Sequence, residues 1–287
     1  MKALLVFVDG LGLRPPAEDN PVNPRVCPTL CRLIDEQSVA IDPRMDVPGL
    51  PQSATGQVAL YTGVNSALRM GRHKEGFPGP TLNAIIEESN LFKTLDARGL
   101  RCCFADGYYA DTIDDLRCRR FKSVTTVMAL TTPKVIRLAP ELLSNQAVLH
   151  DLTRESIRTK GFPGPFITPE KAAEHLLLMS LSNDFTLFEY FLSDLAGHSQ
   201  SYEQASKVLG EIDAFLSALL PPLLEKQMLF ILTSDHGNIE DLSTRGHTAN
   251  DIPFIAIGPG SETLLANVRR ITDITPQLLR VMSRNQK

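Results

Sequence analysis

The stretch LFILTSDHGN, residues 229–238, decides the fold class of this chain. Its first five residues are apolar or β-branched, as in a buried strand, and the run stops at Asp235 and His236. Gly237 then favours a turn. Open α/β sheets bind ligands beyond the carboxyl ends of their strands, so this carboxylate and imidazole stand where a site is expected. Because Asp-His pairs also occur in ordinary turns, the function depends on partners elsewhere.

The rest of the chain alternates between strand and helix patterns. This alternation predicts a doubly wound α/β fold, with a mainly parallel central sheet and helices on both faces. Strands are expected at residues 3–8, 100–105, 124–130, 185–192, 229–233 and 253–257, and helices at residues 29–37, 91–98, 169–181, 202–220 and 274–282. We expect Pro221 and Pro222 to end the helix that begins at Tyr202. No linker-like stretch divides the chain, so one domain is predicted over residues 1–287.

Composition excludes several classes of function. The formal net charge of −4 gives no sign of a nucleic-acid-binding surface. The apolar run at residues 3–8 is too short for a secretory signal, and no stretch approaches the roughly 20 apolar residues of a membrane helix. The five cysteines are an odd number in a large chain, which indicates reduced thiols and a cytoplasmic location. Cys27 and Cys31 fit buried structural thiols better than a zinc knuckle, because no partner pair accompanies them.

Acidic and imidazole groups also follow two other apolar strands. Asp9 comes directly after residues 3–8, and Asp194 with His198 follows residues 185–192. His247 lies just before the last predicted strand. Each of these residues could instead serve a turn or an exposed loop. Together with Asp235 and His236, however, they are expected at one edge of the sheet.

A serine joins this set. The turn-rich residues 49–52 lead into a helix-compatible run, which places Ser53 at or near a helix amino terminus. Free N–H groups and the helix dipole favour an anion such as phosphate there. From local sequence alone, Ser53 could equally be an N-cap, and Thr55 is an equal candidate for either role.

These residue types favour a centre of two metal ions. Asp and His suit Zn or Mn, and the lack of a Cys ligand argues against a closed structural zinc site. Two divalent ions about 4 Å apart suit phosphoryl displacement, and the set is too large for one tetrahedral ion. The seven predicted ligands are Asp9, Ser53, Asp194, His198, Asp235, His236 and His247. We expect His73, His150 and His175 to lie outside the metal centre, as structural or surface residues.

A basic run follows the Ser53 helix. Arg72, His73 and Lys74 form a solvated face by default, and they are also candidates for binding the substrate. The nearby sequence Gly-Phe-Pro-Gly-Pro at residues 76–80 recurs at residues 161–165.

In order and spacing, these motifs resemble the alkaline phosphatase superfamily. Within it, they are most similar to the metal-binding domain of the cofactor-independent phosphoglycerate mutases and its metalloenzyme relatives. The resemblance rests on Asp9-Gly10, Ser53-x-x-Gly56-Gln57, Asp194-x-x-Gly197-His198, Asp235-His236-Gly237-Asn238 and Gly246-His247-Thr248. It implies that Asp194, His198 and His247 hold one ion, and that Asp9, Ser53, Asp235 and His236 hold the other. It also implies that Ser53, rather than Thr55, is the nucleophile.

The chain departs from the mutases in two places. They carry a large inserted domain after the nucleophile helix, whereas residues 64–90 leave room only for a short cap or lid. Gln57 stands where the mutases have a His. The sulfatase branch is disfavoured, because Ser53-Ala54-Thr55 lacks the Pro and Arg that aldehyde formation requires.

The sequence therefore favours a metal-dependent phosphatase that hydrolyses a small phosphate ester through a phosphoserine intermediate. Ser53 would attack phosphorus in line, and water would then release phosphate. A first alternative is a phosphomutase of small sugar phosphates or phosphoglycerate, with the basic run and both Gly-Phe-Pro-Gly-Pro segments forming a small cap. A second is a non-catalytic metal-binding domain, which would have no need of a nucleophile. The expected partner is a small phosphorylated substrate, not nucleic acid or membrane.

Overall fold

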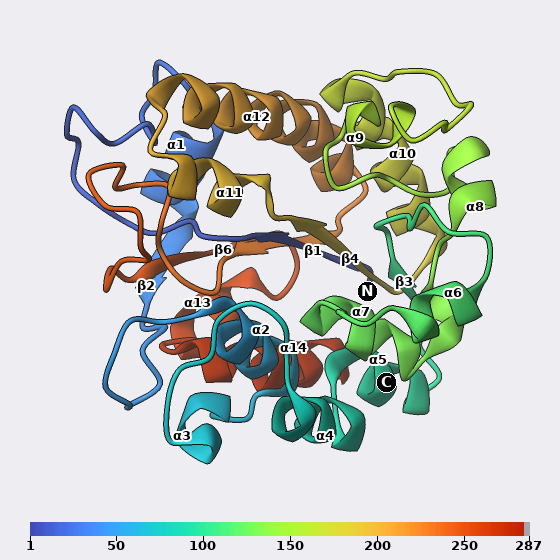
Figure 1. The fold of residues 1–287 in the computed structure, drawn as a ribbon, viewed down its shortest axis with the longest axis horizontal. Coiled ribbons are helices and arrows are strands. Elements are labelled where there is room, and N and C mark those ends of the chain that lie inside the picture. The colour runs from blue at the N-terminus through green and yellow to red at the C-terminus, as the bar shows by residue number, and fades with distance from the viewer. Residues whose placement is uncertain (284–287) are drawn as a thin grey trace.

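The centre of the molecule is a six-stranded sheet in a computed structural model that describes residues 1–283 (Figure 1). The strand order is β2-β6-β5-β1-β4-β3. The strands are β1 (Ala3–Val8), β2 (Ser38–Ile41), β3 (Cys102–Phe104), β4 (Phe185–Tyr190), β5 (Leu229–Thr233) and β6 (Ile252–Ile257). Strand β1 pairs in parallel with both β4 and β5, and β3 is parallel to β4. Strand β6 is antiparallel to its neighbours, so the sheet is mainly parallel, as predicted.

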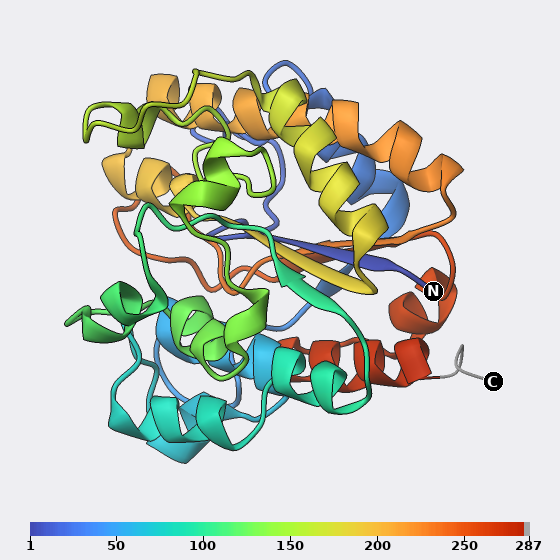
Figure 2. The same ribbon diagram turned by 90° about the vertical axis from the view of Figure 1, so that its right-hand side faces the viewer.

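Helices cover both faces of the sheet (Figures 1 and 2). Side chains alternate along β1, so Leu5 and Phe7 enter one core while Leu4 and Val6 enter the other. Because both faces of β1 are buried, its sequence is a continuous run of apolar residues. The face with Leu4 packs against α1 (Pro28–Gln37), α10 (Pro169–Ser182), α11 (Leu192–Ser199) and α12 (Tyr202–Glu225). The opposite face packs against α2 (Ser53–Thr62), α4 (Pro80–Glu88), α5 (Leu91–Ala97), α7 (Val124–Leu130), α13 (Ser261–Asn267) and α14 (Ile274–Ser283).

Shorter elements complete the chain. The segment expected to be a cap contains α3 (Ser66–Met70) and α4. The other short helices are α6 (Ile113–Cys118), α8 (Ala139–Leu143), α9 (Glu155–Arg158), η1 (Pro133–Val135) and η2 (Ile271–Asp273). Within residues 1–283, none of the helices has the length and apolar character needed to cross a membrane.

The strand predicted at residues 124–130 is wrong, because this segment is helix α7. Its Val and Thr content favours strands, but Ser123 caps the helix by accepting a hydrogen bond from the Thr126 N–H (3.1 Å). Val124, Met128 and Ala129 are then buried in the core beside α2 and α4. Tertiary packing and the cap therefore outweigh the weak intrinsic preference.

The helix predicted to stop before Pro221 continues to Glu225. Pro221 and Pro222 both lie inside α12, in its last turns. Leu219, Leu220 and Leu223 are buried in the core on either side of this pair, which offsets the loss of the proline hydrogen bonds.

The five cysteines are free thiols in the structure. The sulfurs of Cys27 and Cys31 lie 3.8 Å apart on buried side chains. Neither residue belongs to a group of three or more potential metal ligands among residues 1–283.

Candidate active site

Three neighbouring strands deliver the acidic residues to one place. Strands β5, β1 and β4 are adjacent and parallel, so their carboxyl ends lie at the same edge of the sheet. Asp9 follows β1, and Asp235 with His236 follows β5. Asp194 and His198 lie one turn apart on α11, the helix that begins directly after β4, and not in a turn. Asp235 and His236 are fully buried, and Asp9 is nearly so.

Ser53 is the first residue of α2, and Gln52 occupies the N-cap position. Ser53 is therefore not the N-cap. Its hydroxyl oxygen lies 3.0 Å from Nε2 of His236. The Thr55 hydroxyl instead donates to the carbonyl of Gln52 (3.1 Å) and accepts from the N–H of Lys74 (3.2 Å). Of the two candidates, only Ser53 has its hydroxyl within hydrogen-bond distance of a predicted ligand.

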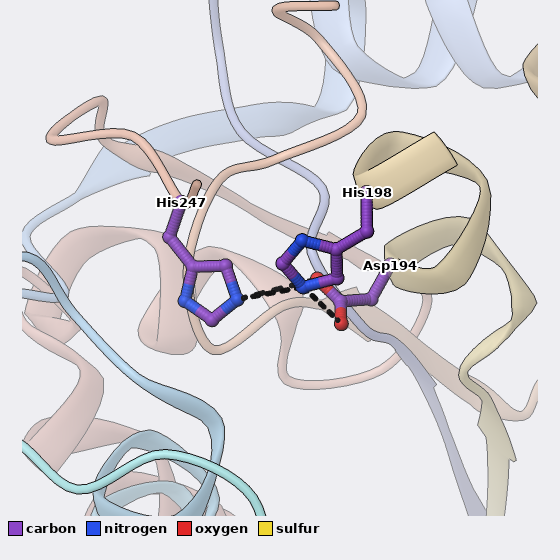
Figure 3. Close-up of side chains that lie close together, drawn as sticks. All are labelled: Asp194, His198 and His247. Carbon is purple, nitrogen blue, oxygen red and sulfur yellow. Dashed lines mark hydrogen bonds and ion pairs between the residues drawn. The ribbon is translucent and has the colours of Figure 1, made fainter. Parts of the chain in front are cut away.

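The first group of potential ligands consists of Asp194, His198 and His247 (Figure 3). The His198 Nε2 lies 3.2 Å from Asp194 Oδ2, and the His247 Nε2 lies 3.5 Å from Asp194 Oδ1. Nδ1 of His198 faces the carbonyl of Arg245 at 2.7 Å, and Nδ1 of His247 faces the carbonyl of Pro51 at 2.9 Å. Carbonyls only accept, so both Nδ1 atoms carry a proton, and in the neutral form of each ring Nε2 presents a lone pair.

Those two lone pairs face each other across 3.3 Å. Two acceptors cannot form a hydrogen bond, and a cation between them satisfies both. The donor set of two imidazoles and a carboxylate is the kind that Zn and Mn accept. The residues present therefore fit a metal ion at this position.

The second group forms around His236. Its Nε2 lies 3.4 Å from Asp9 Oδ1 and 3.5 Å from Asp235 Oδ2. Within residues 1–283, Asp9 Oδ1 is buried and has no hydrogen-bond partner. Asp9, Asp194 and His236 bring three ligand atoms within 4.8 Å of one another, so Asp194 belongs to both groups. The seven predicted ligands thus lie in one cluster, which contains two groups of three residues that could each hold a metal ion and that share Asp194.

The charge balance of this cluster also suits cations. Burial, followed by repulsion from Asp235, raises the pKa of Asp9 well above its usual range. Burial, with repulsion from Asp194, raises the pKa of Asp235 to about 7. Burial, with repulsion from His247, lowers the pKa of His236 to about 3, so this imidazole is neutral. Cations bound beside Asp9 and Asp235 would favour the ionised carboxylates and so oppose this rise in pKa.

Neighbouring residues hold the ligands in place. Gln57 donates from Nε2 to Asp9 Oδ2 and to Asp235 Oδ2, both at 3.2 Å. A side chain at Gly56 would lie 2.9 Å from the Asp235 Cβ, so α2 can approach this close only with glycine there. Asn238 donates to Asp194 Oδ1 at 2.6 Å. The sequence motifs contain all three residues, although their spacing does not reveal these contacts.

Glu240 is a supporting residue that sequence reasoning missed. It is fully buried, and its carboxylate accepts from the backbone N–H groups of Gly12 (3.0 Å) and Asn238 (2.8 Å). It also accepts from the side chains of Thr248 (2.5 Å) and Asn250 (3.0 Å). Glu240 therefore joins the loops after β1 and β5 to the loop that carries His247. No local sequence pattern distinguishes Glu240 from an acidic residue on the protein surface.

An open cleft of about 370 Å³ adjoins the cluster. It is lined by Asp9, Ser53, Gln57, Gly76, Phe77, Ser123, Val124, Glu189, Phe191, Asp194 and Leu195. Sequence reasoning also missed Glu189. It lies within the apolar run of β4, so the sequence predicts only a strand residue there. Burial raises the pKa of Glu189 to about 7, although the Thr125 hydroxyl donates to its carboxylate at 2.6 Å.

The basic run lies in a neighbouring cleft of about 400 Å³. Arg72, His73 and Lys74 line it together with Gln52, the residue before Ser53. The backbone of Lys74 is tied to Thr55 in the first turn of α2 by two hydrogen bonds of 3.2 and 3.3 Å. The run is thus close to Ser53 but outside the cleft that contains it, and its role in substrate binding stays a prediction. His73, His150 and His175 belong to neither ligand group among residues 1–283.

Known proteins resemble this chain in parts of the sequence and in the fold. The family model of the Metalloenzyme superfamily matches residues 1–285. The 2,3-bisphosphoglycerate-independent phosphoglycerate mutase of Acetivibrio thermocellus is 33% identical over 106 residues, which are 34% of this chain and 20% of the mutase. That of Clostridioides difficile is 29% identical over 130 residues, 40% of this chain and 26% of the mutase. The aligned parts are thus about a fifth to a quarter of these curated relatives.

Solved structures match along the whole chain. The alkaline phosphatase of the Antarctic bacterium TAB5 has a TM-score of 0.57 at 13% identity, covering 99% of both chains. The PH0037 protein of Pyrococcus horikoshii has a TM-score of 0.59 at 15% identity, covering 100% of this chain and 98% of that one. Leishmania mexicana phosphoglycerate mutase has a TM-score of 0.53 at 10% identity, covering 98% and 95%. The resemblance predicted from the motifs, and the alkaline-phosphatase-like fold, are confirmed.

Proposed function

The chain belongs to the Metalloenzyme superfamily, and on that premise we propose that it hydrolyses a small phosphate ester through a phosphoserine intermediate. The observation that carries the proposal is the position of the Ser53 hydroxyl. It lies 3.0 Å from His236 Nε2, in a cluster with places for two cations, and it lines an open cleft. The proposed nucleophile, the potential metal ligands and a cleft that could hold a substrate therefore lie side by side.

We assign one cation to Asp194, His198 and His247, and the other to Asp9, Ser53, Asp235 and His236. Two bound Zn or Mn ions would stabilise negative charge on the serine oxygen and on the phosphoryl oxygens. The chain itself orients the reacting atoms. Neutral His236 faces the Ser53 hydroxyl, and the amino terminus of α2 favours the phosphate.

The reaction has two displacements. Ser53 Oγ attacks phosphorus in line, the bond from phosphorus to the ester oxygen breaks, and the alcohol leaves with a proton. A water molecule then attacks the phosphoserine, which regenerates the Ser53 hydroxyl and releases inorganic phosphate. Gln57 would hold the carboxyl groups of Asp9 and Asp235 in position in both steps, because its Nε2 donates to both.

The open cleft favours hydrolysis over intramolecular transfer. Phe77 and Leu195 line it and are about half exposed, so water can reach Ser53 from this side. We propose that residues 64–90 act as a short cap that contributes Gly76 and Phe77. A mutase must keep its intermediate away from water. A phosphomutase is the second candidate, favoured by the aligned segments of the phosphoglycerate mutases.

The experiment is phosphate release from a panel of phosphomonoesters and one diester, with Mn²⁺ or Zn²⁺, by wild type, Ser53→Ala and Thr55→Ser. Hydrolysis by wild type and Thr55→Ser, lost in Ser53→Ala, would support the proposal. Isomerised sugar phosphate without release would favour the mutase. If folded, metal-binding protein catalysed neither ester hydrolysis nor isomerisation, the result would favour a non-catalytic metal-binding domain.

A further inference from the structure

The cleft beside Ser53 is lined by both acidic and apolar side chains. The acids are Asp9, Asp194 and Glu189, and the larger apolar residues are Phe77, Val124, Phe191 and Leu195. In an in-line displacement, the leaving oxygen lies opposite the attacking Ser53 oxygen. The phosphoryl group would therefore lie beside Ser53, and the alcohol of the ester would lie on the far side of it, within reach of the apolar side chains that line the cleft.

The rim of the cleft carries large apolar side chains that folding leaves in water. Phe77 is 49% exposed and Leu195 57%, and Phe121, which does not itself line the cleft, is 58% exposed. Phe77 and Phe121 stack, with ring centroids 5.3 Å apart and planes 25° from parallel. Isolated exposed apolar residues are ordinary, but a stacked pair beside a nucleophile forms a flat apolar surface where the ligand enters.

The cleft has no positive charge for an anionic alcohol. Within the described chain, its lining residues include acids but no Lys, Arg or His. Arg72 and Lys74 line the neighbouring cleft instead. The Arg120 guanidinium lies over the Phe121 ring at 5.1 Å and is not a lining residue. An alcohol with its own carboxylate, such as glycerate, would meet no cationic side chain among these lining residues.

We infer that the preferred substrates are phosphate esters of flat, apolar, uncharged alcohols, with the alcohol held against Phe77 and Leu195 and with Phe121 stacked on Phe77 to support it. The inference rests on the proposed function and adds the class of leaving group. It separates this chain from an enzyme that acts on phosphoglycerate, because that alcohol is small, polar and anionic.

The test compares benzyl, ethyl and glycerate phosphate esters with the Mn²⁺-loaded protein. We expect kcat/KM for benzyl phosphate to exceed that for ethyl phosphate by about tenfold, as a buried aromatic contact permits, with 3-phosphoglycerate the poorest. Phe77→Ala should remove most of this preference, mainly through KM, and Phe121→Ala should weaken it in the same way, because Phe121 stacks on Phe77. Phe166→Ala is the matched control, because Phe166 is also 49% exposed but does not line the cleft.

A binding measurement separates this inference from the proposed reaction. Benzylphosphonate and ethylphosphonate cannot be hydrolysed, and calorimetry gives their Kd values with the metal-loaded protein. Tighter binding of the benzyl compound, lost in Phe77→Ala but kept in Phe166→Ala, would support the inference even if no ester were cleaved. Equal turnover and equal binding of benzyl and ethyl compounds would overturn it while the hydrolase stood. A preference that survived in both Phe77→Ala and Phe121→Ala, or best turnover of 3-phosphoglycerate, would also overturn it.

Discussion

The Nε2 atoms of His198 and His247 lie 3.3 Å apart, while each Nδ1 faces a backbone carbonyl. The carbonyls fix a proton at each Nδ1, so in the neutral form of both rings the two Nε2 lone pairs converge. His198 is on α11 and His247 is on a loop, and they reach each other only through the fold. Such convergence of acceptors is unfavourable without a cation, and it sets the first expectation.

Removing His247 should weaken metal binding. We expect Mn²⁺ or Zn²⁺ to raise the Tm of the wild type, since a ligand at 100 times its Kd adds about 2.7 kcal/mol to the free energy of unfolding. His247→Ala should lose most of that increase, because one of the three ligand side chains of this group is gone. The measurement is the metal-induced change in Tm, by calorimetry after EDTA treatment.

His175→Gln is the control for this experiment, because His175 is a buried histidine outside both ligand groups of residues 1–283. It should keep the full metal-induced change even if its own Tm is lower. An equal loss of the metal effect in both variants would contradict the assignment of His247.

The metal-free protein should lose stability as pH rises. Burial raises the pKa of both Glu189 and Asp235 to about 7, above the values of about 4 expected in the unfolded chain. Between these values the folded state holds more protons than the unfolded state, so stability decreases with increasing pH. We expect the Tm in EDTA to fall from pH 5 to pH 8.

Glu189→Gln should make this fall shallower, because the amide is neutral throughout. Glu203→Gln, which changes an exposed acid, should keep the wild-type slope. Saturating Mn²⁺ should reduce the slope further, since cations replace the protons of Asp9 and Asp235. A Tm that rose across this range in EDTA would refute the expectation.

The sequence predicted the parts of the site that follow buried strands. The apolar runs before Asp9 and Asp235 are long and end abruptly, and parallel strands place their carboxyl ends together. The fold class followed from the same runs. Ser53 could not be separated from Thr55 by local pattern, because only the packing of α2 on the Asp235 loop decides which hydroxyl faces His236.

Other features depend on contacts between distant residues. Glu189 is opposite Phe7 in the β1–β4 register, and its place in the cleft follows from the assembled sheet rather than from its neighbours in sequence. The helix at residues 124–130 contradicts its strand-like composition because of the Ser123 cap and its burial. Intrinsic strand preference depends on context, and at residues 124–130 packing against the core favours the helix.

Asp213 should stabilise α1 across the fold. The α1 N-cap, Cys27, makes no side-chain capping bond, and Asp213 on α12 accepts from the Leu30 N–H at 2.7 Å. Asp213→Ala should therefore lower the free energy of unfolding by about 1–2 kcal/mol, the usual effect of losing a cap. Urea denaturation measures it. Asp35→Ala, which removes an exposed acid from α1, should change stability by less than about 0.5 kcal/mol. Comparable losses in both variants would refute this role.

Gln57 should matter most when the metal ions are absent. Its Nε2 donates at 3.2 Å to Asp9 and to Asp235, and this donor lies between two carboxyl groups that are otherwise poorly compensated. Gln57→Leu keeps a similar volume and leaves both oxygens without that donor, so we expect the free energy of unfolding in EDTA to fall by about 1–3 kcal/mol. With saturating Mn²⁺ the loss should be smaller, because the cations would compensate the same oxygens. Urea denaturation of wild type and variant under both conditions provides the comparison. An identical loss with and without metal would mean that Gln57 acts through helix packing and not through the two carboxylates.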